Sequence, residues 1–269
     1  MIVVGESLNG TLAGPQRAIL AHNEAWIQQM ALDQIRCGAQ MLDVNSGGIS
    51  QDREVEDLVW MVEAIQAVAQ VPLVLDSSNA KAIEAAAKVY RGKSLLLSSI
   101  SVERRNLESA PAILSLASEK GCGVVALCIG PQAIPVTAQG RLAIANTLYE
   151  MAMTRGITAE NLYFDPIVSP VGTQAQAGTV ALETTRLIKE HLPGARTIVG
   201  VSNISYGLPR RKLLNGAFLA MLAAAGVDAC IVDVRDLGLM SILRAAQAVA
   251  GQDKMCKDYI RAYRAGSLQ

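Results

Sequence analysis

Aromatic residues make up only 4% of this 269-residue chain, and charged residues only 18%. Basic and acidic residues balance at 24 each, so the chain carries no net positive charge at neutral pH. Nucleic-acid binding normally needs a basic surface, and single-stranded targets also need aromatic rings on which bases stack. The composition therefore argues against nucleic-acid binding and favours a small or weakly charged substrate, or a protein partner.

Cysteine is scarce, and its spacing suggests no disulfides. The five cysteines form no CxxC pair and their number is odd, which is typical of reduced thiols in a cytoplasmic protein. Residues 1–6 lack the charged region and the long apolar run of a signal peptide. No uncharged apolar stretch approaches the length of a membrane span, so we expect no membrane association.

Short apolar runs alternate eight times with longer segments of helical period. The predicted strands are 2–5, 40–44, 72–75, 94–97, 123–128, 162–164, 197–201 and 229–232. The predicted helices are 15–36, 52–69, 79–90, 107–120, 138–154, 176–191, 209–225 and 237–250, with a short final piece at 254–264. Eight such units without a linker predict an α/β protein with a single (β/α)8 TIM barrel domain over residues 1–269. A doubly wound open sheet is the alternative.

In such a barrel, the C-terminal ends of the strands and the loops after them form the active face. Carboxylates and amides dominate these positions, and neither histidine lies there. They are Glu6, Asn9, Asp43, Asn45, Asp76, Asn79, Asp165, Asn203, Asp233 and Asp236. No histidine or cysteine cluster offers a metal site, and no lysine is placed for a Schiff base.

An aspartate at a strand end often caps the next helix, and for Asp43 and Asp233 this role is as consistent with the sequence as a functional one. Asp76 lies three residues before Asn79, which is the better cap. Asp165 is followed by Pro166 and a long loop, so no helix begins there. We therefore expect Asp76 and Asp165 to act in the site.

A ring of carboxylates and amides suits a heterocycle that presents several hydrogen-bond donors. A pterin presents an N–C(NH2)–NH edge that donates to a carboxylate, and a carbonyl that accepts from amides. A purine or another heterocycle would satisfy the same logic. The residue types alone therefore predict a heterocycle-binding barrel.

Six segments at these strand ends resemble the methyltetrahydrofolate:corrinoid methyltransferases, which belong to the pterin-binding barrel family. They are VGESLN at 4–9, LDVN at 42–45, QD at 51–52, LDSSN at 75–79, DP at 165–166 and GVSNIS at 200–205. Pro170, Asn215 and residues 218–219 match as well. The resemblance spans nearly the whole chain.

The resemblance implies an enzyme, usually a homodimer, that moves a methyl group between N5 of tetrahydrofolate and the cobalt of a corrinoid carried on another protein. It implies that Asp76 and Asp165 hold the pterin edge, and that Asn203 approaches N5 as the catalytic residue. The other substrate-binding residues that it implies are Ser98, Ser202, Ser205 and Arg211. Because the D-x-H-x-x-G signature of cobalamin-binding domains is absent, we expect a corrinoid protein as partner and no metal bound by this chain.

The chain departs from the family pattern at three positions. Ser7 stands where arginine is common, Ser98 replaces an amide that contacts the pterin, and Tyr206 takes a place that is often polar. A dihydropteroate synthase-like enzyme is one alternative, although the seventh strand ends in Val-Ser-Asn and not in the Ser/Lys/Arg pattern of that enzyme. A non-catalytic folate-binding protein is the other.

Overall fold

Eight parallel strands close into a barrel in the computed structural model, which describes residues 1–47, 53–104 and 106–269. Each strand pairs with the next along the chain, and β1 pairs with β8. The strands are β1 (Ile2–Asn9), β2 (Met41–Asn45), β3 (Leu73–Asp76), β4 (Leu95–Ile100), β5 (Gly123–Leu127), β6 (Leu162–Asp165), β7 (Arg196–Gly200) and β8 (Ala229–Val232). The predicted (β/α)8 barrel is confirmed, and the open sheet is excluded.

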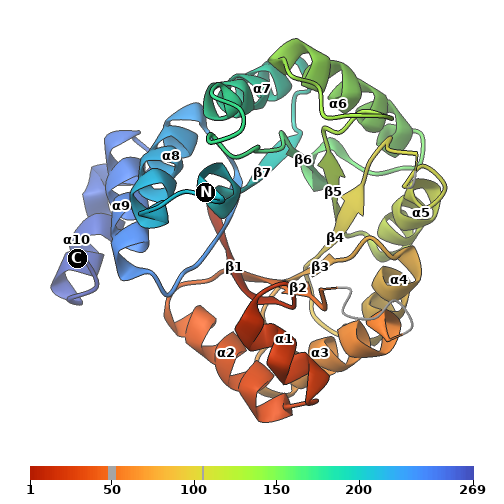
Figure 1. The fold of residues 1–269 in the computed structure, drawn as a ribbon, viewed down its shortest axis with the longest axis horizontal. Helices are drawn as coiled ribbons and strands as arrows, with labels where there is room; N and C mark the ends of the chain where they lie inside the picture. Colours follow the sequence, from red (N-terminus) through yellow and green to blue (C-terminus); the bar gives the residue numbers. More distant parts are fainter. Residues whose placement is uncertain (48–52, 105) are drawn as a thin grey trace.

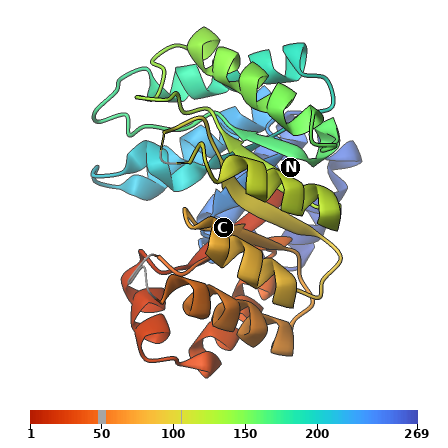
Figure 2. The same ribbon diagram turned by 90° about the vertical axis from the view of Figure 1, so that its right-hand side faces the viewer.

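The helices form a ring around the strands, as both views of the ribbon show (Figure 1, Figure 2). They are α1 (Ala13–Leu20), α2 (Glu24–Arg36), α3 (Glu54–Val68), α4 (Ala80–Val89), α5 (Ala110–Lys120), α6 (Ala138–Met153), α7 (Ala177–His191), α8 (Arg211–Ala225), α9 (Leu237–Val249) and α10 (Lys257–Arg264). Short 3-10 helices are η1 (Ala159–Asn161), η2 (Val201–Ser205) and η3 (Lys254–Cys256). Within the described residues, no helix has the length and apolar character needed to cross a membrane.

The prediction of one helix over residues 15–36 is wrong, because the chain turns between α1 and α2. His22 adopts a left-handed conformation (φ 46°), its ring stacks on Trp60 at 4.6 Å, and its Nε2 lies 3.2 Å from Asp57 Oδ1. The Asn23 side chain then accepts the Trp26 N–H and begins α2. The start predicted for the next helix at residue 52, and the QD motif at 51–52, lie outside the described residues.

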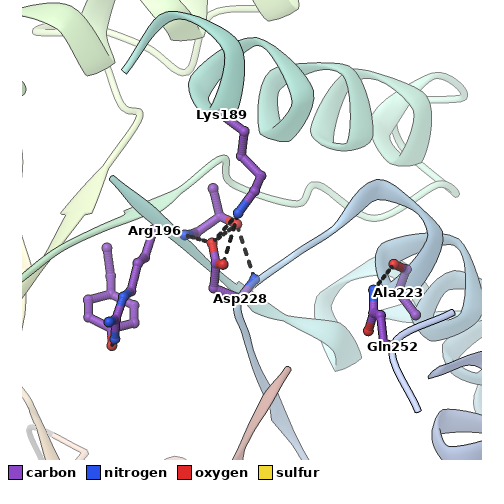
Figure 3. Close-up of polar contacts among 7 residues, drawn as sticks. Lys189, Arg196, Ala223, Asp228 and Gln252 are labelled. Carbon is purple, nitrogen blue, oxygen red and sulfur yellow. Dashed lines mark hydrogen bonds and ion pairs between the residues drawn. The ribbon is translucent and has the colours of Figure 1, made fainter. Parts of the chain in front are cut away.

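An ion pair ties the outer helix α7 to the N-terminal ends of two strands (Figure 3). Lys189 Nζ lies 2.8 Å from both carboxylate oxygens of Asp228, which also accepts the Thr197 N–H at 2.8 Å. Farther along the chain, Gln252 Nε2 donates to the Ala223 carbonyl and fastens the C-terminal segment to α8. These contacts hold the end of the barrel opposite the candidate site.

Candidate active site

Strand alternation builds a polar layer above the apolar interior of the barrel. Successive side chains of a strand point to opposite faces, so residues two apart share the interior face. In five strands an apolar interior residue is followed two positions later by a polar one: Val4 and Glu6, Met41 and Asp43, Val74 and Asp76, Leu96 and Ser98, and Tyr163 and Asp165. The polar layer therefore lies where the strands end, on the face that the sequence predicts to be active.

A cavity of about 620 Å³ opens over this polar layer, a size that suits a small organic ligand. Its lining includes six of the seven predicted substrate-binding residues, namely Asp76, Ser98, Asp165, Ser202, Asn203 and Arg211. The seventh, Ser205, is fully buried behind the loop after β7 and does not line the cavity. The predicted residues thus come together from β3, β4, β6 and the region after β7.

Asp76 lies at the end of β3, opposite Ser98 of β4 in the register of the sheet. Asn45 Nδ2 donates to Asp76 Oδ2 at 2.6 Å. Burial raises the pKa of Asp76, and hydrogen bonds from the Asn45 and Ser98 side chains oppose that rise. Asp76 caps no helix, because the Asn79 side chain accepts the Lys81 N–H at the start of α4. Its carboxylate is therefore available to a ligand.

Asp165 ends β6, and no helix begins until α7 at Ala177. Its Oδ1 accepts the Ile167 N–H at 2.7 Å. Burial raises the pKa of Asp165 to about 6, while the Ile167 N–H and the Arg141 guanidinium act in the opposite direction. Asp165 is thus a second half-buried acceptor, on the wall of the cavity formed by β6.

Two further carboxylates, which the sequence analysis placed at strand ends but did not name as substrate-binding residues, line the cavity. Asp43 is only 4% exposed, and burial together with the nearby Asp76 raises its pKa well above the usual range. Burial also raises the pKa of Glu6 to about 7, against the hydrogen bond that Ser202 Oγ donates to Glu6 Oε2 at 3.1 Å. The signal that identifies both is the two-residue step that follows Val4 and Met41 on the interior face.

Arg211 fixes the loop after β7, which carries the predicted catalytic amide. Its guanidinium donates to Ser205 Oγ at 3.0 Å and to the Ser202 carbonyl at 2.7 Å. Asn203 is exposed at the mouth of the cavity. A Cβ atom at Gly200 would lie 3.2 Å from Asn203 Nδ2, so the glycine leaves room for the amide to turn. The loop backbone is held firmly while the Asn203 side chain has space to move.

Two of the positions that depart from the family pattern, Ser7 and Tyr206, lie near the rim of the cavity. Ser7 Oγ donates to Asp233 Oδ1 at 3.4 Å, and the same oxygen accepts the Arg235 N–H at 3.2 Å. Asp236, not Asp233, caps α9, by accepting the Leu239 N–H. Tyr206 is 69% exposed. Asp233 therefore belongs to the rim and not to a helix cap.

The cavity favours a ligand that donates hydrogen bonds. Among the residues that the structure describes, its lining includes six carboxylates and two cations: Glu6, Asp43, Asp76, Asp165, Asp233 and Asp236, with Arg211 and Lys212. Burial raises the pKa of Cys128 at the end of β5, so this thiol stays neutral and is no nucleophile. Among the described residues, no group of three or more histidine, cysteine, aspartate or glutamate side chains is arranged to hold a metal ion.

A smaller cavity of about 340 Å³ lies at the opposite, N-terminal end of the strands. Lys93 and Arg196 line it, and no carboxylate does among the described residues. Figure 3 shows the Arg196 side chain directed away from Asp228 and Lys189. Its described lining offers a donor-rich heterocycle no carboxylate, so the larger cavity is the candidate active site.

Residues 17–233 match the pterin binding enzyme family, and the chain belongs to this family. The chain is 29% identical over 268 residues to the methylcorrinoid:tetrahydrofolate methyltransferase of Eubacterium limosum, an alignment that covers 100% of this chain and 98% of that protein. It is also 28% identical over 241 residues to methionine synthase of Mycobacterium tuberculosis, covering 86% of this chain and 20% of that protein. The predicted resemblance to methyltransferases of the pterin-binding barrel family is confirmed.

The barrel also resembles solved structures of another enzyme in this fold class. The 7,8-dihydropteroate synthase of Vibrio fischeri matches it with a TM-score of 0.69 and 18% identity, covering 93% of each chain. At that identity the likeness establishes a shared fold and says nothing about a shared reaction.

Proposed function

We propose that this protein transfers a methyl group from a methylated corrinoid, carried on a separate protein, to N5 of tetrahydrofolate. The observation that carries the proposal is the cavity itself, in which Asp76 and Asp165 are half-buried acceptors and Asn203 lies at the mouth. The relative from Eubacterium limosum, which matches along its full length, supports this reaction and its direction.

Asp76 and Asp165 hold the pterin in this proposal. The N–C(NH2)–NH edge of the pterin donates in parallel, and a carboxylate accepts in parallel, so each donor finds a partner inside the cavity. Ser98 provides a shorter polar side chain beside Asp76 and leaves room for a bridging water. Ser202 and Arg211 complete the wall formed by the loop after β7, and Ser205 supports that wall from behind.

Asn203 contacts N5 in the transition state. During transfer the cobalt–carbon bond would break with its electron pair remaining on cobalt, which passes from Co(III) to Co(I). The N5 lone pair would form the new carbon–nitrogen bond, and the proton on N5 would leave to solvent. An amide accepts a hydrogen bond through its oxygen and donates through its nitrogen, so Asn203 serves N5 both before and after it loses the proton. The protein contributes mainly the alignment of two large substrates.

The corrinoid arrives with its partner protein, because this chain has no corrinoid-binding motif. Charged residues at the mouth of the cavity and in the segments after β7 and β8 are available to a docking partner. They are Arg210, Arg211, Lys212, Asp233, Arg235 and Asp236. We also propose that the protein is a cytoplasmic homodimer, as the family resemblance implies. Sedimentation equilibrium should then give a mass of about twice 28.5 kDa.

Two assays on the purified protein separate this proposal from the synthase alternative, and methyl transfer from methylcobalamin to tetrahydrofolate separates it from a non-catalytic folate-binding protein. Calorimetry should detect stoichiometric binding of tetrahydrofolate, and the protein should not form dihydropteroate from a pterin pyrophosphate and aminobenzoate. Formation of dihydropteroate would favour the synthase alternative. The absence of folate binding would remove both the methyltransferase and the folate-binding alternative.

A further inference from the structure

Arg141 of α6 is fully buried, although it is the most polar of the large side chains in the interior. Its guanidinium donates to three backbone carbonyls: Nε to Pro135 at 2.9 Å, and one terminal nitrogen to Pro166 at 2.8 Å and to Ile167 at 2.7 Å. The other terminal nitrogen is buried and has no hydrogen-bond partner among the described residues. Burying a guanidinium is costly, so a group held in this way points to a specific task.

Two of the three carbonyls that Arg141 binds belong to Pro166 and Ile167, the residues that follow Asp165. Ile167 has a left-handed backbone (φ 62°), which is strained for a β-branched residue and persists only when neighbouring groups hold it. In that conformation the Ile167 N–H points at Asp165 Oδ1, at 2.7 Å. Arg141 therefore fixes the peptide between Pro166 and Ile167. The N–H of that peptide donates to one carboxylate oxygen of Asp165 and so orients the carboxylate.

We infer that Arg141 is a positioning residue for the site: it fixes the loop that orients Asp165 and places a positive charge behind that carboxylate. This inference rests on the proposed function, in which the ionised carboxylate of Asp165 binds the pterin edge. Arg141 does not line the cavity, so it acts through Asp165 and touches no substrate.

The charges around Asp165 come from three sides. Asp76 of β3 faces it across the cavity and favours the neutral acid, and the Cys128 thiol at the end of β5 is uncharged. Arg141 supplies the cation that favours the carboxylate. Burial has already raised the pKa of Asp165 to about 6, close to neutrality. Loss of Arg141 would raise this pKa further, so that much of Asp165 would be protonated at pH 7.

The test is the pH profile of tetrahydrofolate affinity, measured by calorimetry without oxygen between pH 5.5 and 8.5. Arg141→Met keeps the bulk of the side chain and removes its charge and donors. We expect it to move the midpoint of the profile upward by about one pH unit, the size of effect typical of one nearby opposite charge. From a midpoint near 6, such a shift weakens binding about twofold at pH 7 and by nearly 10-fold at about pH 5.5. Arg155→Met is the matched control and should leave the profile unchanged, because Arg155 donates to the Met151 carbonyl of its own helix region and does not line the cavity.

A purely structural role would give a different result. It would lower the melting temperature of Arg141→Met and leave the midpoint of the pH profile in place, and that outcome would overturn the inference. In the Asp165→Asn background the charge has nothing to act on, so adding Arg141→Met should cost far less affinity than the same change in the parent. A loss of equal size in both backgrounds would also overturn the inference.

Arg141→Lys replaces Arg141→Met in this comparison if the methionine variant does not fold. The lysine keeps the charge but cannot bond both the Pro135 carbonyl and the carbonyls of Pro166 and Ile167. Affinity should therefore fall in the parent background with little movement of the pH midpoint. The same change should have little effect on affinity in the Asp165→Asn background. If the parent itself binds no tetrahydrofolate, the proposed function fails; if it binds and these variants bind alike, only the role of Arg141 fails.

Discussion

The carboxylate of Asp165 is expected to lower the stability of the folded protein at neutral pH and to increase its affinity for a pterin. Its carboxylate is buried among protein groups and partly neutralised by the Ile167 N–H and by Arg141, yet its pKa still rises to about 6. The free protein therefore carries an incompletely compensated charge at neutral pH. A pterin edge would donate hydrogen bonds to this carboxylate, so ligand binding should compensate its charge.

Asp165→Asn should separate these two effects. The amide oxygen still accepts the Ile167 N–H, and the buried charge is gone, so the melting temperature at pH 7.5 should stay level or rise. The amide nitrogen now faces pterin donors, so tetrahydrofolate affinity should fall by about 2–4 kcal/mol, the effect of a mispaired buried group. Asp76→Asn should behave similarly.

Asp33→Asn, on the exposed face of α2, is the matched control. Unchanged affinity in a folded Asp165→Asn variant would remove Asp165 from the site.

The raised pKa values predict opposite pH trends for stability and binding. Glu6 and Asp165 have pKa values of about 7 and 6, against ordinary values of 4.5 and 3.8. The folded protein thus holds these protons more tightly than the unfolded chain, so the free energy of unfolding should fall as the pH rises from about 4 to 7. Tetrahydrofolate affinity should rise over the upper part of the same range, because pterin donors need ionised carboxylates.

Chemical denaturation and calorimetry at matched pH values check both trends. Asp165→Asn should flatten the stability profile near pH 5 to 6. A parent protein whose stability increases between pH 5 and 7, or whose folate affinity is the same at both values, would contradict the electrostatic account.

At the residue scale, the strand-end pattern predicted Asp76 and Asp165 in the cavity, because the position of a strand end follows from its apolar run. The pattern did not identify Arg141. Its position on α6 places it far from any strand end in the sequence, and only the packing of α6 against the loop after β6 reveals its contacts. Ser205 shows the converse: it is adjacent to the site in sequence, yet it points behind the loop.

At the scale of elements, the eight strands could be predicted because each is a short apolar run bounded by polar residues. The break between α1 and α2 could not, because no glycine or proline marks it. The turn depends instead on contacts that His22 makes with Trp60 and Asp57, more than thirty positions along the chain. Long-range packing overrides the local helical pattern at this point.

Asn23→Ala should test the local part of that turn. The variant loses the side-chain oxygen that accepts the Trp26 N–H at 3.1 Å, so the free energy of unfolding should fall by about 1 kcal/mol, as is typical for loss of a helix cap. Folate affinity should not change, because Asn23 lies outside the cavity lining. Asn23→Asp keeps an acceptor at this position and should restore most of the stability; equal losses in both variants would show that the cap is unimportant.

At the scale of the whole molecule, the proposed function assigns folate binding to the cavity of the barrel and corrinoid binding to a partner protein. The protein should therefore be purified without a cobalt chromophore, which absorption spectroscopy and cobalt analysis would check. A stoichiometric, tightly bound corrinoid in the isolated protein would contradict this division of roles. The family resemblance predicted the division, whereas the residue pattern alone reached only a heterocycle-binding barrel.

The most direct measurement of the central claim is single-turnover methyl transfer from methylcobalamin to tetrahydrofolate at saturating concentrations. The parent protein should form 5-methyltetrahydrofolate, and Asn23→Ala should match its rate. Asn203→Ala should bind folate with modestly reduced affinity and transfer the methyl group roughly 10²–10³-fold more slowly, the range for loss of one oriented hydrogen bond in a transition state. A parent that binds folate without transferring the methyl group, or an Asn203→Ala variant as fast as the parent, would contradict the account.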